Sequence, residues 1–262
     1  MDDNYHTYIN RLMRMTLPES YRSQLQHIHE SPKFMVNADG HRQPTLFPGY
    51  TIATPPWSTD SLNAPLHSKL TLFQKTLLHQ LPSQLVEPLP PSSFHLTLAD
   101  LIWDSAYRHV LNENSQFEEQ LRNRIGEIFH QYQPTIGRGI PLQWQVVGLM
   151  VMPRAIGVCL VPHGEDSYHR LLELRRAVYQ NSELVSLGIE QQYHLTAHIT
   201  LGYFGTIPPD LDREAMASDL ENLNQLWIDD GSPLLSIPRA ELQKFDTMFH
   251  YYRDEDWPSL DF

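Results

Sequence analysis

Two stretches of the sequence share one pattern, Phe94-His95-Leu96-Thr97-Leu98-Ala99 and Ala197-His198-Ile199-Thr200-Leu201-Gly202. Side chains alternate between the two faces of a β-strand, so each stretch, as a strand, places its His and Thr on one face and its apolar side chains on the other. Burial of the apolar faces would leave an imidazole beside a hydroxyl on each open face. The next residue on that face is small, Ala99 or Gly202, which would leave room for a ligand.

A simpler interpretation of this pattern is two amphipathic strands whose His and Thr are solvated or hydrogen-bonded at a surface. The recurrence with a following Leu and a small residue favours a functional pair instead. In a third triplet, His194-Leu195-Thr196, the His would lie on the same face of the strand as His198, but the triplet lacks these flanking residues. We expect His198 to carry the chemistry and His194 to border the cleft at the beginning of the second strand.

The rest of the chain predicts a mixed α+β architecture. The 262 residues are 41% hydrophobic and 19% charged, which is a globular composition with enough length for one large domain or two lobes. Apolar periodicity predicts two helical pieces within 4–31 and helices over 65–80, 113–133, 166–180 and 210–227. Strands are expected near 50–53, over 94–99, 195–203 and 234–245, and as a hairpin of 142–152 with 155–161.

The charge, the cysteine count and the lack of apolar runs exclude several kinds of partner and structural feature. The net charge of −12, with 13 acidic against 4 basic residues after residue 204, disfavours a long nucleic acid. The single cysteine, Cys159, excludes an intramolecular disulfide. The sequence has no apolar run long enough for a membrane helix, and the start Met1-Asp2-Asp3-Asn4 has no secretory signal, so we expect a cytoplasmic protein without a membrane partner.

The paired His-x-Thr strands resemble those of the 2H phosphoesterase superfamily, which includes LigT-like proteins and RNA 2′,3′-cyclic phosphodiesterases. The wider sequence is similar to a bacterial and fungal branch of that superfamily. The similar segments are Lys33-Phe34 with Asp39-Gly40, Phe47-Pro48-Gly49-Tyr50-Thr51, Leu89 to Leu98, and His198 to Tyr203. Together they span the chain from about Lys33 to Phe249.

The resemblance implies a single two-lobed domain over residues 33–262, preceded by a helical extension over 1–32. Antiparallel sheets would line a central cleft, with helices outside and one His-x-Thr strand from each lobe. It also implies chemistry without a metal or other cofactor, with His95 and His198 as catalytic residues and Thr97 and Thr200 as phosphate ligands. Histidine suits this role, because opening a cyclic phosphodiester needs a base and an acid near neutral pH.

Other side chains are weaker candidates for the cleft. Tyr50, Arg154 and Tyr251 could line it. The alternation of side chains along the second strand places Tyr203 behind the sheet with the apolar residues, unless a β-bulge intervenes.

We therefore expect hydrolysis of a small cyclic phosphodiester, of the 2′,3′-cyclic nucleotide or ADP-ribose cyclic phosphate type, by a protein taken as a monomer. One alternative is a non-catalytic module that binds nucleotides or RNA ends in the same cleft. The other is a metal-dependent hydrolase that uses His163 and His169, although the acidic residues between them also suit the first turn of a helix.

Overall fold

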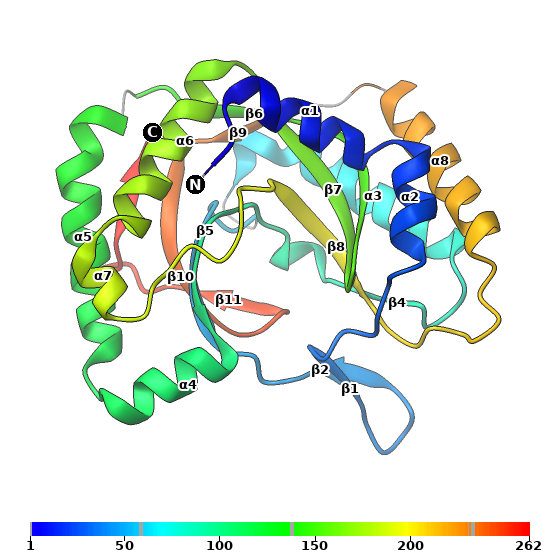
Figure 1. Ribbon diagram of the computed structural model, residues 1–262, viewed down its shortest axis with the longest axis horizontal. Coiled ribbons are helices and arrows are strands. Elements are labelled where there is room, and N and C mark those ends of the chain that lie inside the picture. Colours follow the sequence, from blue (N-terminus) through cyan, green and yellow to red (C-terminus); the bar gives the residue numbers. More distant parts are fainter. Residues whose placement is uncertain (1, 58–59, 137–138, 230, 232–233) are drawn as a thin grey trace.

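The structure is a computed structural model that describes residues 2–57, 60–136, 139–229, 231 and 234–262 (Figure 1). Its core contains two five-stranded antiparallel sheets. The first sheet has the order β11-β10-β3-β5, with β12 paired to β10, and the second has the order β4-β8-β7-β6-β9. A small hairpin of β1 (Phe34–Val36) and β2 (Arg42–Pro44) lies apart from both.

The chain passes between the two sheets several times. The first sheet consists of β3 (Gly49–Ala53), β5 (Thr97–Trp103), β10 (Arg239–Thr247), β11 (His250–Tyr252) and β12 (Ser259–Asp261). The second consists of β4 (Val86–Pro88), β6 (Leu142–Met152), β7 (Ala155–Pro162), β8 (His198–Phe204) and β9 (Leu234–Ile237). Each His-x-Thr segment therefore leads into a strand of a different sheet, β5 from Thr97 and β8 from His198, as the resemblance implies.

The helices cover the outer sides of the two sheets (Figure 1). The second sheet is flanked by α1 (Tyr5–Met15), α2 (Pro18–Leu25), α3 (Ala64–Gln80) and α8 (Arg213–Asp229). On the side of the first sheet lie α4 (Asp104–Glu113), α5 (Phe117–Ile136) and α7 (Ser182–Ser186). Helix α6 (Glu165–Tyr179) contacts β5, β6 and β7 and so joins the two lobes.

The predicted α+β class and the β6–β7 hairpin are confirmed. The strand predicted over 234–245 is wrong in one respect, because it is two strands that belong to different sheets. Pro238 separates β9 from β10, and a proline cannot donate a ladder hydrogen bond within a continuous strand. Helix α4 has no counterpart among the predicted elements, and α5 continues past its expected end to Ile136 with Pro134 inside it.

The first two helices are packed into the core of the second lobe. Tyr8 and Tyr21 are buried, and their hydroxyls donate hydrogen bonds to the backbone carbonyls of Leu160 (3.3 Å) and Leu149 (3.0 Å). These bonds connect α1 and α2 to the two central strands, β7 and β6. The division of the chain into an extension over 1–32 and a domain over 33–262 stays a prediction.

Within the described parts of the chain, no helix combines the length and apolar character needed to cross a membrane.

Candidate active site

The two His-x-Thr segments line one cavity between the sheets. The cavity has a volume of about 760 Å³, and His95, Thr97, His198 and Thr200 all contribute to its wall. His95 lies two residues before the start of β5, and His198 is the first residue of β8. Residues about one hundred positions apart in the chain therefore meet in one site.

Both imidazoles are anchored in the same way. Nδ1 of His95 lies 2.8 Å from the carbonyl oxygen of Ser93, and Nδ1 of His198 lies 2.7 Å from that of Thr196. A carbonyl oxygen only accepts hydrogen bonds, so each Nδ1 must carry the hydrogen and each Nε2 is unprotonated in the neutral ring. The shared tautomer leaves both Nε2 atoms available to take up or deliver a proton.

The Leu that follows each His-x-Thr triplet is the extra residue of a β-bulge. Thr97 and Ala99 pair with consecutive residues of β3, which leaves Leu98 unpaired, and Thr200 and Gly202 pair with consecutive residues of β7, which leaves Leu201 unpaired. The carbonyl of Leu98 accepts a hydrogen bond from Nη1 of the buried Arg175 (3.0 Å). The carbonyl of Leu201 accepts one from the backbone N–H of Leu89 (3.0 Å) and one from Nε2 of the buried Gln74 (2.7 Å).

The bulges shift the alternation by one residue, so the expected placement of Ala99, Gly202 and Tyr203 is wrong. After each Thr, the next side chain in the cavity wall is Asp100 on β5 and Tyr203 on β8. Ala99 is in the core. Gly202 faces β4 at a close approach, where an added Cβ would lie 2.5 Å from Cγ1 of Val86 and 2.8 Å from the carbonyl oxygen of Glu87.

The cavity lowers the pKa of both imidazoles. Burial lowers the pKa of His95 to about 4, against the hydrogen bond to Ser93, and the charges of His198 and Lys33 lower it further. Burial also lowers the pKa of His198, but here the Thr196 hydrogen bond and the negative charge of Asp100 oppose the shift. The two rings are thus close enough to interact electrostatically.

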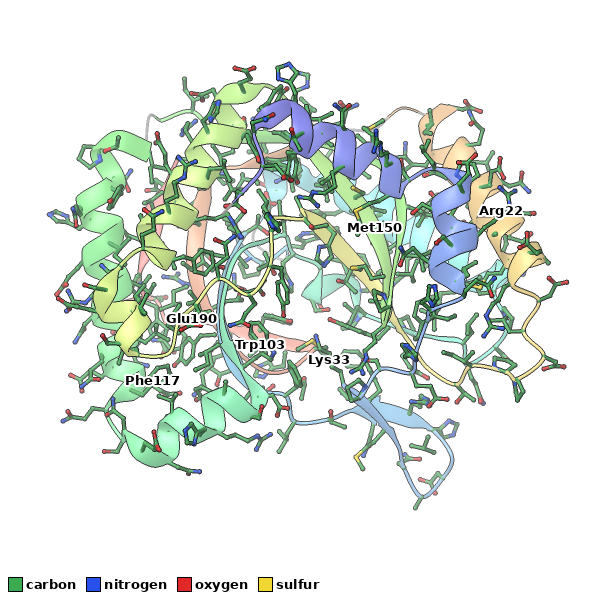
Figure 2. The ribbon with its side chains drawn as sticks, viewed as in Figure 1. Arg22, Lys33, Trp103, Phe117, Met150 and Glu190 are labelled. Atoms are coloured by element: carbon green, nitrogen blue, oxygen red, sulfur yellow. The ribbon has the colours of Figure 1, made fainter. Side chains whose placement is uncertain are left out.

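Lys33 brings a positive charge to this site from the segment before β1. Its Nζ donates a hydrogen bond to the Tyr203 hydroxyl (3.2 Å) and lies 4.7 and 4.8 Å from the ring centroids of Phe47 and Tyr203. Figure 2 labels Lys33, from the turn before β1, together with Trp103 of β5 and Met150 of β6, and all three line the cavity. The sequence segment Lys33-Phe34 contributes to the resemblance, but nothing in its spacing indicates a place in the cavity.

The remaining candidates divide into two groups. His194, Arg154 and Tyr251 line the cavity, and the ring of Tyr251 lies 4.3 Å from that of His95, centroid to centroid. Tyr50 does not line the cavity, so the expectation that it could do so is wrong. On β3 its neighbour Thr51 takes the cavity face, so Tyr50 is fully buried on the opposite face, beside Tyr107, Trp257 and Arg122.

The alternative metal ligands lie elsewhere. Neither His163 nor His169 belongs to the cavity wall among the described residues. In the same part of the chain, no group of three or more His, Cys, Asp or Glu side chains is arranged to hold a metal ion.

Much of the remaining wall is apolar and aromatic. Trp103 and Tyr193 stack with their ring centroids 6.1 Å apart at a planar angle of 23°. Four methionines also contribute, Met15, Met150, Met152 and Met248. None of these six side chains is indicated by the sequence pattern, because they come from helix α1, strands and loops that meet only in the folded chain.

Comparison with known proteins finds similarity in structure only. A conserved protein of unknown function from Agrobacterium tumefaciens str. C58 aligns with a TM-score of 0.54 and 16% identity over 85% of this chain and 89% of that chain. A crystal structure of E. coli LigT complexed with 3′-AMP is also similar, with a TM-score of 0.45 and 14% identity over 83% of this chain and 99% of that chain. The same holds for a crystal structure of a phosphoesterase, with a TM-score of 0.44 and 16% identity over 82% of this chain and 99% of that chain. The chain therefore shares its overall fold with the Agrobacterium tumefaciens protein. No family model and no curated protein matches its sequence.

Proposed function

We propose that this protein is a 2H-type phosphodiesterase that hydrolyses a small cyclic phosphodiester. The observation that carries the proposal is the shared anchoring of His95 and His198 in one cavity, with Nδ1 of each fixed by a backbone carbonyl two residues earlier. Fixing Nδ1 sets the tautomer and limits rotation of each ring, as is needed for a proton donor and a proton acceptor on one substrate.

The two imidazoles supply the proton transfers of the reaction. One neutral ring takes a proton from water while the water oxygen bonds to phosphorus. The other ring, protonated, gives its proton to the ester oxygen as the bond from that oxygen to phosphorus breaks. The products are a phosphomonoester and a free hydroxyl, and one water molecule is consumed.

Thr97 and Thr200 stabilise the phosphoryl oxygens in this proposal. Each is two residues after its His on the cavity side of the strand, so its hydroxyl can donate to a non-bridging oxygen of a phosphate held between the rings. Lys33 adds a positive charge on the side of Tyr203 and so favours the anionic substrate.

The rest of the wall suits a nucleoside-sized group. Trp103, Tyr193 and Tyr251 offer aromatic faces for a base, and base stacking on such side chains contributes about 1–3 kcal/mol each. The cavity of about 760 Å³ falls within the range of small-ligand sites, about 300–1,000 Å³. We therefore propose a 2′,3′-cyclic nucleotide or an ADP-ribose cyclic phosphate as the substrate class.

The test is turnover of the four 2′,3′-cyclic nucleotides and of ADP-ribose cyclic phosphate in excess EDTA, followed by chromatography. The proposal predicts a phosphomonoester product at a rate that EDTA does not change. Binding of these compounds without product would indicate a nucleotide-binding module instead. Loss of turnover on chelation would indicate a metal-dependent hydrolase.

A further inference from the structure

The segment before His198 has no regular structure of its own, although it contains the carbonyl that anchors the ring. Residues 194–197 belong to no helix, strand or turn. The Thr196 carbonyl accepts the hydrogen bond from Nδ1 of His198 (2.7 Å). Backbone groups of an irregular segment must find their partners elsewhere in the fold. The position of the anchor therefore depends on the side chains that hold this segment.

Arg11 of α1 holds the segment with two donors of its guanidinium. Nη2 donates to the carbonyl of Leu195 (2.6 Å), and Nη1 donates to the hydroxyl of Thr196 (3.0 Å). Nε of the same group donates to Oδ2 of Asp3 (2.8 Å), which fixes the guanidinium from the other side. A planar group with several donors holds its acceptors in one geometry. Both acceptors lie within one residue of the carbonyl that anchors His198.

Two more side chains near Arg11 in the sequence hold the flanking backbone. Oδ1 of Asp2 accepts a hydrogen bond from the N–H of Leu195 (3.1 Å), and the Tyr8 hydroxyl accepts one from the N–H of Ala197 (3.2 Å). Within the described chain, the cavity wall includes none of residues 2–11. These residues therefore act on the site through the backbone before His198 and not by contact with a ligand.

The equivalent anchor of the first lobe is held by a local turn. Ser93 ends the 3₁₀ helix Pro91–Ser93, and its N–H and hydroxyl both donate to the carbonyl of Pro90 (2.8 Å each). The two histidines thus share one anchoring bond but differ in what supports it. The support of His198 comes from a guanidinium 184 and 185 residues away in the chain from its two acceptors.

We propose that Arg11 is a positioning residue for His198. By fixing Leu195 and Thr196, its guanidinium sets the direction of the Thr196 carbonyl, and so the tautomer and the orientation of the imidazole. This inference deepens the proposed function and rests on it for the effect on rate. Displacement of a catalytic group by about 1 Å can cost about 10²-fold in rate, so support at this distance from the cavity is enough to matter.

The first test is the tautomer of each imidazole in the free protein, measured from the NMR chemical shifts of the ring nitrogens at mildly alkaline pH. In the wild type, both rings should carry the hydrogen on Nδ1. Arg11→Met, which keeps the apolar part of the side chain, should give His198 a mixture of the two tautomers and leave His95 unchanged. Arg14→Met is the matched control, because Arg14 is exposed on the same helix, and it should change neither ring.

Thr196→Val tests the same contact from the other side. It keeps the branching of the side chain and removes the hydroxyl that accepts from Arg11, so the test holds even if Arg11→Met does not fold. His198 should change in the same direction by a smaller amount. An unchanged His198 ring in the folded variants, or an equal change in both rings, would overturn the inference. These readouts need no substrate, so they stand even if the protein fails to turn over a cyclic nucleotide.

The second test separates kcat from KM. Arg11 is outside the cavity wall, so Arg11→Met should lower kcat on a 2′,3′-cyclic nucleotide by about 10–100-fold and change KM by less than about threefold. Arg14→Met should retain the wild-type values of both. An unaltered kcat in Arg11→Met, or a loss confined to KM, would overturn the positioning role.

Discussion

Replacement of either histidine by alanine tests the proposed chemistry most simply. Each imidazole is partly buried, lines the shared cavity, and makes one anchoring hydrogen bond to a backbone carbonyl. Loss of a positioned acid or base costs about 10²–10⁴ in rate, which is about 3–5 kcal/mol of transition-state stabilisation. Loss of the anchoring bond costs the fold only about 0.5–1.5 kcal/mol.

The two effects are measured separately. We expect kcat/KM on a 2′,3′-cyclic nucleotide to fall by about 10²–10⁴ in His95→Ala and in His198→Ala. The midpoint of thermal unfolding should fall by only a few degrees, since about 1 kcal/mol shifts Tm by about 2–4 °C in a protein of this size. The double variant should lose far less than the product of the two single losses, because the two groups act on one reaction.

His194→Ala is the matched control. His194 belongs to the neighbouring His-x-Thr triplet and lines the same cavity, but no anchoring bond from its ring to a backbone carbonyl is present among the described residues. We expect a loss of less than about tenfold, below the range for a positioned acid or base. Full turnover by either of the other two variants, or a loss in His194→Ala as large as in His198→Ala, would refute the assignment.

Three further predictions concern pH, charge and packing. The free-enzyme kcat/KM should be highest below pH 6.5, because the pKa of His95 is lowered to about 4 and that of His198 is also lowered, so the imidazole that acts as the acid loses its proton as pH rises; a rise in kcat/KM from pH 6.5 to 9 would contradict this. Lys33→Met should lower kcat/KM by about 10–100-fold, the value of one charge-assisted hydrogen bond, with Tm unchanged within about 2 °C, and an unaltered kcat/KM would remove Lys33 from the site. Gly202→Ala should destabilise the fold by about 1–3 kcal/mol in chemical denaturation, because the added Cβ meets Val86 and the backbone of Glu87, and an unchanged midpoint would show that β4 can move away.

The paired motif carried most of what could be predicted. Alternation of polar and apolar residues around His95 and His198 indicates two half-buried strands, and that expectation needs only local information. The helix over 65–80 and the hairpin of β6 with β7 are also local patterns, and both are present. The two-lobed arrangement came instead from the resemblance, because no local pattern states which strands share a sheet.

The bulges could not be predicted, and they decide which side chains reach the cavity. A bulge depends on the register of the neighbouring strand, β3 for Leu98 and β7 for Leu201, and these strands are distant in sequence. One extra residue moves Tyr203 from the expected core face to the cavity. The same shift brings Asp100 into the site, although strict alternation gives that position to Ala99.

Long-range packing explains the other differences. Lys33 reaches the site because the segment before β1 lies beside Phe47 and Tyr203, a contact between residues up to 170 positions apart. Tyr50 is buried in the core because Thr51, its neighbour on β3, lies on the cavity face of the strand. Neither result follows from residue type or spacing near these positions.

A crystal structure of the protein with a nucleoside 3′-phosphate, the product class of the proposed reaction, would examine the shared phosphate site directly. Oxygens of one phosphate should lie about 2.6–3.2 Å from Nε2 of both His95 and His198, with the hydroxyls of Thr97 and Thr200 donating to the same group. A phosphate bound outside this cavity, or in contact with one imidazole only, would contradict a reaction at a single phosphorus held between the two lobes.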